Sequence, residues 1–331
     1  MLISTKDEII ESILLKTSNE TQLNNSYVRF FSVIIPAFNA EKFIYSCIES
    51  VLNQTFQDFE LIICDNASTD GTSQIIKQFA GQIKIITLSE NIGPAGGRNA
   101  GIEASSGHYV ALLDADDVWE PEKLDKYYKL IKKTGTNFVF SKFSVFSDDT
   151  YKGMSVSPRK KTTTFPIKDP LLLVKNYVPC SSVTINREII SSRPFNEEVN
   201  IRTTEDHLLW IQLNQNHTFS YIDEPLTKYR IHSEQSTNSV RTHARYFRYL
   251  QIVEDTNLFE PWYIGYCWKV INVQLTIQNR QWIKVIPALL KFLLISINPR
   301  FQKVSFELIT MTIRRGLQSL KTISKITSSS K

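Results

Sequence analysis

The chain has 331 residues, of which 42% are hydrophobic and 11% aromatic, a composition typical of globular proteins and not of disordered ones. Its formal net charge of +5 is unevenly spread, because residues 241–331 carry 14 Lys and Arg against 4 Asp and Glu, which leaves the first 240 residues with a net charge of −5. No apolar run reaches about 18 residues, so a conventional membrane-spanning helix is not expected.

The N-terminal residues and the cysteines predict the cellular compartment of the protein. Residues 1–30 lack the layout of a signal peptide, and we expect at most a short helix there, over residues 6–15. The four cysteines are widely spaced and form no CxxC pair, which predicts reduced core thiols and not a zinc site or a disulfide framework. They are Cys47, Cys64, Cys180 and Cys267. We therefore expect a cytoplasmic protein.

Short apolar runs and amphipathic segments alternate along the next part of the chain. The first run, Phe31–Ile35, is a predicted strand that ends at Pro36, which cannot donate a backbone hydrogen bond to a sheet. Asn39 can cap the following helix, whose apolar residues from Phe43 to Leu52 recur at three- and four-residue spacing. Further strands are predicted over residues 59–64, 83–88 and 109–113, and further helices over residues 72–79 and from residue 93.

This alternation of strand and helix predicts an α/β fold with a mostly parallel sheet and helices on both of its faces. Ligands of such sheets bind beyond the carboxyl ends of the strands. For Asp70, which precedes Gly71, we expect only a turn and helix-capping role. The polar residues at or near the expected strand ends are Asn39, Asp65, Asp70, Arg98, Asp114 and Asp116.

The stretch from Tyr109 to Trp119 carries a specific chemical signal. A buried strand is expected to run directly into three carboxylates, those of Asp114, Asp116 and Asp117. Carboxylates at this spacing repel one another unless a cation or hydrogen-bond donors separate them. Their oxygens are hard ligands, so the pattern predicts a Mg²⁺ or Mn²⁺ site that can hold a diphosphate.

Other nucleotide-binding designs fit the sequence poorly. The segment after the first strand has no GxGxxG, which argues against a dinucleotide fold, and residues 93–99 lack the Gly-Lys-Ser/Thr of a P-loop. The aspartates near residues 65 and 114 do not meet the spacing of an EF-hand loop. What remains is a sheet edge that offers carboxylates to a ribose, a base and a metal, with Arg98 nearby.

Several motifs in a fixed order resemble those of the family 2 glycosyltransferases. The resemblance is dense over residues 31–130 and returns in two later segments. It implies a GT-A fold and an inverting transfer from a nucleotide sugar, for which we expect UDP. The sequence departs from the family at Asn66, Ala67 and Gly97, where Asp, Gly and Ala are more usual. The motifs are Ser50–Phe56, Phe59–Gly71, Gly93–Gly101, Leu113–Trp119, Thr204–Trp210 and Lys228–Ser236.

The resemblance also implies roles for single residues. It assigns Asp116 to the metal, with Asp117 as a neighbour that orients the ligands, and it places Asp114 on the ribose or on a metal-bound water. We expect His232 either to complete the metal shell or to bind phosphate. Asp65 and Arg98 would read the uracil or the ribose. The nucleotide-binding set that it implies is Pro36, Ala37, Phe38, Asn39, Asp65, Arg98 and Asp114.

A separate carboxylate pair predicts the general base. Glu205 and Asp206 directly precede an apolar helical face, so they are expected on the first turn of a helix, where the dipole favours an ionised carboxylate. This suits Asp206 as the base of a single displacement that inverts the anomeric carbon, with Glu205 in a supporting, capping position. A retaining mechanism would need a nucleophile near the donor, and the sequence nominates none.

These observations divide the chain into an extension over residues 1–30, a catalytic domain over residues 31–237 and a basic, mainly helical region over residues 238–331. The catalytic domain consists of a nucleotide-binding half (31–130) and an acceptor half (131–237), in which residues 179–185 are a predicted strand. The apolar stretch Trp282–Ile297 is too interrupted to span a bilayer. It either lies on an anionic membrane surface or packs on the catalytic domain.

Three functions remain open at this point. The first is a metal-dependent glycosyltransferase that acts on a glycan or lipid-linked acceptor in cell-surface polysaccharide synthesis, peripheral to the inner face of the membrane and with no nucleic-acid partner. The second is a sugar-nucleotide nucleotidyltransferase, which would need a Gly-rich, basic triphosphate loop where Pro36–Asn39 stands. The third is a non-catalytic nucleotide- or carbohydrate-binding module, against which the presence of Asp116 and Asp206 argues.

Overall fold

The computed structural model describes residues 28–147, 150–154, 164–165, 176–235 and 242–257, together with Phe259 and Gly265. The helix expected over residues 6–15, Cys267, the apolar stretch Trp282–Ile297 and most of the basic C-terminal region lie outside these residues. The other three cysteines, Cys47, Cys64 and Cys180, are free and buried, which confirms the prediction of core thiols for them.

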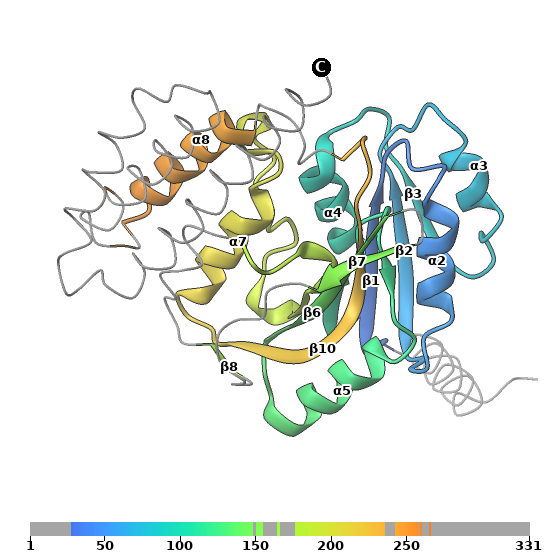
Figure 1. Ribbon diagram of the computed structural model, residues 1–331, viewed down its shortest axis with the longest axis horizontal. Helices are drawn as coiled ribbons and strands as arrows, with labels where there is room; N and C mark the ends of the chain where they lie inside the picture. The colour runs from blue at the N-terminus through green and yellow to red at the C-terminus, as the bar shows by residue number, and fades with distance from the viewer. Residues whose placement is uncertain are drawn as a thin grey trace, which may run out of the picture.

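One mixed sheet runs through the described part of the chain (Figure 1). Its strands follow the order β3-β2-β1-β4-β9-β6-β10-β5, and β7 pairs with β6 while β8 pairs with β10. The strands are β1 (Phe31–Ala37), β2 (Phe59–Asp65), β3 (Lys84–Thr87), β4 (Tyr109–Leu112), β5 (Val118–Trp119), β6 (Phe138–Ser147), β7 (Thr150–Met154), β8 (Thr164–Phe165), β9 (Thr184–Asn186) and β10 (Phe219–Arg230).

The first four strands pair in parallel, as predicted. β1 lies between β2 and β4, and β2 pairs with β3. The expected stop at Pro36 is wrong, because β1 continues to Ala37. The pairing with β4 extends only as far as Ile34, so Pro36 lies beyond it, where a missing N–H costs no hydrogen bond between these two strands.

Helices cover both faces of the sheet, which confirms that part of the prediction (Figure 1). Alternate β1 side chains point to opposite faces, so Val33 and Ile35 join one core cluster and Ile34 joins the other. No helix in the described residues is long and apolar enough to cross a membrane. The helices on the first face are α2 (Ile44–Leu52), α3 (Thr72–Lys77) and α5 (Lys123–Thr134), and those on the second are α4 (Gly93–Glu103), α7 (Glu205–Asn214) and α8 (Thr242–Asp255).

The second half of the sheet mixes strand directions. β9 is antiparallel to both β4 and β6, and β10 is parallel to β6 and antiparallel to β5. The strand predicted over residues 179–185 is largely wrong, because Cys180–Ser182 form a 3₁₀ helix, η1, before β9 begins. The amide of Ser182 donates to the carbonyl of Pro179 at 2.9 Å, which closes this turn. The other 3₁₀ helices are η2 (Arg187–Ile189) and η3 (Val199–Ile201).

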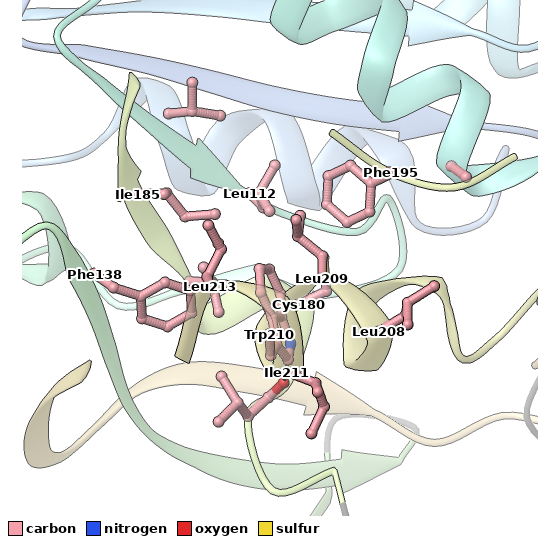
Figure 2. Packing of buried hydrophobic residues seen from close by; sticks show 14 of the residues in the cluster. Leu112, Phe138, Cys180, Ile185, Phe195, Leu208, Leu209, Trp210, Ile211 and Leu213 are labelled. Atoms are coloured by element: carbon pink, nitrogen blue, oxygen red, sulfur yellow. Dashed lines mark hydrogen bonds between the residues drawn. The ribbon is translucent and has the colours of Figure 1, made fainter. Parts of the chain in front are cut away.

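Helix α7 is enclosed by the core of the second face. Its residues are buried on most sides, as expected for a helix that is apolar around its circumference. At its centre Trp210 packs edge-on against Phe138, with ring centroids 5.2 Å apart, and its indole N–H donates to the carbonyl of Val178 at 3.0 Å. Figure 2 shows Leu209 and Leu213 beside Leu112 and Ile185 in this cluster. The packing fixes the direction in which the first turn of α7 points.

Candidate active site

The loops that follow β1 and β2 interlock at the carboxyl edge of the sheet. Asn39 has a φ of 50°, its amide donates to the Ser68 hydroxyl at 3.1 Å, and its side-chain oxygen accepts from the Thr69 amide at 2.8 Å. Asn39 therefore does not cap α2, whose N-cap is Phe43, and that expectation is wrong. The cause is the competing loop after β2, whose amides take the Asn39 side chain.

The residues of the predicted nucleotide-binding set differ in exposure. The ring of Phe38 is 45% exposed, whereas Ala37 is buried in β1 and pairs with Asp65 at the end of β2. Asp65 is itself buried, and its carboxylate accepts from the Ser68 amide at 3.0 Å and from the Ser73 hydroxyl. The structure thus holds the Asp65 carboxylate firmly at the edge where a nucleotide site was predicted.

Two of the departures from the family motif have structural reasons. The buried amide of Asn66 donates to Asn91 Oδ1 and to the carbonyl of Gly93 and accepts from the Ile92 amide, so Asp at this position could not make both donations. At Gly97 a Cβ would lie 3.0 Å from Cβ of Pro36, which is closer than ordinary contact. In contrast, Ala67 adopts a φ of 58°, a left-handed conformation that Gly would tolerate better.

Arg98 connects the two groups of predicted site residues. It lies in the middle of α4 and is only 5% exposed. One guanidinium nitrogen is 2.7 Å from Asp114 Oδ1 and the other is 2.9 Å from Glu205 Oε1. Bonds of this charge-assisted kind are among the strongest side-chain hydrogen bonds. Arg98 therefore ties the loop after β4 to the first turn of α7.

Asp116 and His232 come together from residues that are far apart in the chain. Their Oδ2 and Nε2 atoms are 3.0 Å apart, and the imidazole packs against the ring of Phe43. Burial, and then the neighbouring Asp114 carboxylate, raise the pKa of Asp116, while His232 lowers it. A cation beside Asp116 would relieve both of the effects that disfavour its ionised form.

This pair suits a divalent cation. Adjacent ligands of an octahedral Mg²⁺, each about 2.1 Å from the ion, lie roughly 3 Å apart, which is close to the separation of the two side chains. Mg²⁺ commonly takes only one or two protein ligands and completes its shell with phosphates and water. Within the described residues no group of three or more His, Cys, Asp or Glu could hold a metal, so an ion at this pair would depend on phosphates and water for its other ligands.

Asp117, next to Asp116 in the chain, is directed into the protein. It is 1% exposed, and its two oxygens accept from the Ser181 hydroxyl at 2.5 Å and from the Arg230 amide at 2.9 Å. Burial, followed by the charges of Asp116 and Asp114, raises its pKa well above the usual range. Asp117 thus links the loop after β4 to η1 and to the end of β10.

Glu205 and Asp206 lie on the first turn of α7, where the sequence predicts them. Glu205 is buried against Arg98, whereas Asp206 is partly buried and accepts from Asn176 at 2.9 Å and from the His207 amide at 2.7 Å. Burial and the adjacent Glu205 carboxylate raise the pKa of Asp206 to about 7, against the lowering effect of Arg98. An acid of this pKa can accept a proton near neutral pH.

The sequence interpretation missed three residues that contact the site, namely Asn176, Ser181 and Arg230. Arg230 donates through Nε to the carbonyl of Asp116 at 2.9 Å and lies over the ring of Phe146. Arg230 belongs to the motif Lys228–Ser236 of the family resemblance, and its place in that motif could have identified it as a site residue. Asn176 lies in a segment without a recognisable pattern and Ser181 in one that was predicted as a strand, so long-range geometry alone reveals their contacts with the site.

Comparison with known proteins identifies a family and several similar proteins. A family model described as "Glycosyl transferase family 2" matches residues 32–192. The UDP-Glc:alpha-D-GlcNAc-diphosphoundecaprenol beta-1,3-glucosyltransferase WfgD of Escherichia coli is 31% identical over 214 residues, which cover 63% of this chain and 79% of that protein. The putative teichuronic acid biosynthesis glycosyltransferase TuaG of Bacillus subtilis (strain 168) is 32% identical over 206 residues, 60% of this chain and 78% of that protein.

The fold is also shared with solved structures. The structure of S. aureus TarS 1-349 in complex with UDP-GlcNAc superimposes with a TM-score of 0.58 at 20% identity, covering 86% of this chain and 80% of that one. The complex of the same protein with UDP gives a TM-score of 0.55 at 22% identity, covering 74% and 70%. At this identity the likeness shows the fold alone, and it confirms the predicted GT-A type. Motifs, fold and relatives together show that the chain belongs to glycosyltransferase family 2 and is an enzyme of that family.

Proposed function

We propose that this enzyme transfers a sugar from a UDP-sugar to a hydroxyl of a lipid-linked or glycan acceptor, with inversion at the anomeric carbon. The observation that carries the proposal is the double contact of the Arg98 guanidinium, which binds both Asp114 and Glu205. Asp114 precedes Asp116, which contacts His232, and Glu205 precedes Asp206. The similar proteins support the substrate classes, since WfgD is named a UDP-Glc:alpha-D-GlcNAc-diphosphoundecaprenol beta-1,3-glucosyltransferase.

The metal side of the site would neutralise the leaving diphosphate. Asp116 and His232 would hold Mg²⁺ or Mn²⁺, and the bound ion supplies Lewis-acid stabilisation of the charge that develops on the phosphates. Asp114 lies beside this pair and is oriented by Arg98, so it is placed for the ribose or for a metal-bound water. Asp65 and the segment Pro36–Asn39 lie at the same edge and would contact the nucleoside.

The base side would activate the acceptor. The carboxylate of Asp206 takes the proton of the acceptor hydroxyl while the acceptor oxygen bonds to the anomeric carbon and the bond to the diphosphate breaks, so that UDP leaves with the electron pair. The N-terminus of α7 favours the ionised form of Asp206, and burial opposes it, which together suit a base that works near neutral pH.

The enzyme would act at the inner face of a membrane if its acceptor is lipid-linked. Residues 241–331 carry a net charge of +10, which favours an anionic lipid surface. Deletion of residues 280–331 followed by membrane fractionation tests this part of the proposal. Loss of membrane pelleting is the expected result, and unchanged pelleting would contradict it.

Thermal unfolding with nucleotide sugars tests the donor and the metal together. UDP-glucose or UDP-GlcNAc should raise the unfolding temperature in the presence of Mn²⁺, because a ligand at 100 times its Kd stabilises the folded state by about 2.7 kcal/mol. EDTA and the Asp116→Ala variant should remove most of this shift, and GDP-mannose serves as the control donor. An equal shift with EDTA present would show that the metal has no part in donor binding.

A further inference from the structure

The 3₁₀ helix η1 lies against the loop after β4, and its middle residue contacts that loop at two points. The hydroxyl of Ser181 accepts from the Asp114 amide at 3.1 Å and donates to the carboxylate of Asp117 at 2.5 Å. Ser181 is 1% exposed, so these two contacts are made without competition from solvent.

The same contacts extend to the other metal-site residue. The second oxygen of Asp117 accepts from the Arg230 amide, and Arg230 in turn donates to the carbonyl of Asp116. His232, two residues further along, reaches the Asp116 carboxylate. A continuous chain of hydrogen bonds therefore runs from Ser181 through Asp117 to the backbone that carries His232.

Three side chains from two other elements, β5 and α5, fix η1 itself. Trp119 donates its indole N–H to the carbonyl of Ser181 at 2.7 Å, and Tyr127 donates its hydroxyl to the carbonyl of Ser182 at 2.5 Å. The fully buried ammonium of Lys123 lies 3.2 Å from the same Ser182 carbonyl and 4.1 Å from the centre of the Tyr127 ring. Held in this way, η1 can act as a rigid reference point for the groups that hydrogen-bond to it.

We propose that Ser181 is a positioning residue that sets the placement of His232 relative to Asp116 by hydrogen bonding through Asp117. The inference rests on the proposed metal site for its functional consequence, but the geometric claim stands without it. Groups that orient metal ligands in this way typically change metal affinity or activity by about 10–100-fold when they are removed.

Ser181→Ala and Ser182→Ala form a matched pair for the test. Both residues are buried in η1, but the Ser182 hydroxyl donates within the turn to the carbonyl of Pro179, away from Asp117. In the full-length protein with ¹³C-labelled histidine, the imidazole signal of His232, assigned with His232→Gln, should shift in Ser181→Ala and stay in place in Ser182→Ala. The Mn²⁺ concentration for half-maximal transfer should rise by about 10-fold or more only in Ser181→Ala.

Each outcome decides a different claim. An unmoved His232 signal in a folded Ser181→Ala protein overturns the positioning role, whatever the activity does. If the His232 signal shifts in Ser181→Ala but the wild-type enzyme is active without metal, the positioning role is supported and the proposed metal function is contradicted. If Ser181→Ala does not fold, Asp117→Ala removes both oxygens of the next link of the chain and should displace the same signal. An unmoved signal there has the same negative meaning.

Discussion

The loop after β4 and the first turn of α7 each carry adjacent carboxylates, and in each pair one residue is buried against the scaffold while its neighbour is partly exposed. After β4, Asp117 is held by a serine hydroxyl and a backbone amide, and Asp116 reaches His232. In α7, Glu205 is held by the guanidinium of Arg98, and Asp206 stays partly exposed. Neutral donors thus anchor the first pair, whereas a cation that also reaches Asp114 anchors the second.

The difference matters because the Arg98 guanidinium contacts side chains of both regions. Loss of a neutral donor affects its own loop, but loss of Arg98 would leave Glu205 and Asp114 without the charge that holds them. The proposed function places proton transfer in one region and metal binding in the other. Each assignment can be tested by itself.

The largest expected effect is the loss of transfer activity when Asp206 of α7 is replaced. Asp206→Asn removes the proton acceptor and should lower the rate of transfer by about 10²–10⁴-fold while the donor still binds with metal. Steady-state transfer and the UDP-dependent thermal shift measure the two properties separately. Asp223→Asn, at an exposed ion pair with Lys142, is the control and should keep full activity. A fully active Asp206→Asn enzyme would refute the base assignment.

The next effect concerns the cation that joins the regions. Arg98→Met leaves a buried carboxylate without its partner and should lower the free energy of unfolding by about 3–5 kcal/mol. Arg193→Met is a matched control, because Arg193 also contacts two carboxylates, Glu103 and Glu197, but its side chain is 42% exposed, and its loss should cost less than about 1 kcal/mol. Urea unfolding measures both variants. Equal losses would show that Arg98 is an ordinary ion pair.

A smaller effect is expected from the packing of the helix that carries Arg98. A Cβ at Gly101 would lie 2.4 Å from Cγ2 of Ile34 and 3.0 Å from Sγ of Cys64, so Gly101→Ala should push α4 away from the sheet and cost about 1–3 kcal/mol of stability. Gly81→Ala is the control, because nothing lies within 4 Å of the position its Cβ would take. A Gly101→Ala protein as stable as the control would mean that α4 can shift without cost.

The smallest predicted effect is the change in the rate of transfer with each pH unit. Because the pKa of Asp206 is about 7 and its ionised form is the base, the rate of transfer should rise about tenfold per pH unit below 7 and level off above it. Stability should respond in the opposite sense. A raised carboxyl pKa means that the folded state binds the proton more tightly, so this contribution to stability is present below about pH 4 and is lost as the pH rises to about 7. A rate that stays flat from pH 5 to pH 8 would contradict the role of Asp206.

Sequence reasoning reached the parallel half of the fold because its signals are local. Apolar runs that end in polar residues identified β1, β2 and β4, and the apolar face after Glu205 identified α7. It failed at Pro36, at Asn39 and over Cys180–Ser182, where pairing partners and competing donors far along the chain decide the structure. The joint contact of Arg98 with both regions and the anchoring of Asp117 by Ser181 depend on the closed fold, and no local pattern encodes them.

The stereochemistry of the product tests the central claim most directly. With the UDP-sugar that raises the unfolding temperature as donor and a lipid-linked acceptor, proton NMR of the first product reports the configuration at the transferred anomeric carbon. A single displacement assisted by Asp206 predicts a β-linked product from an α-linked donor, formed with Mn²⁺ and absent with EDTA. An α-linked product would contradict the account, because retention requires a nucleophile that neither the loop after β4 nor the first turn of α7 is proposed to supply.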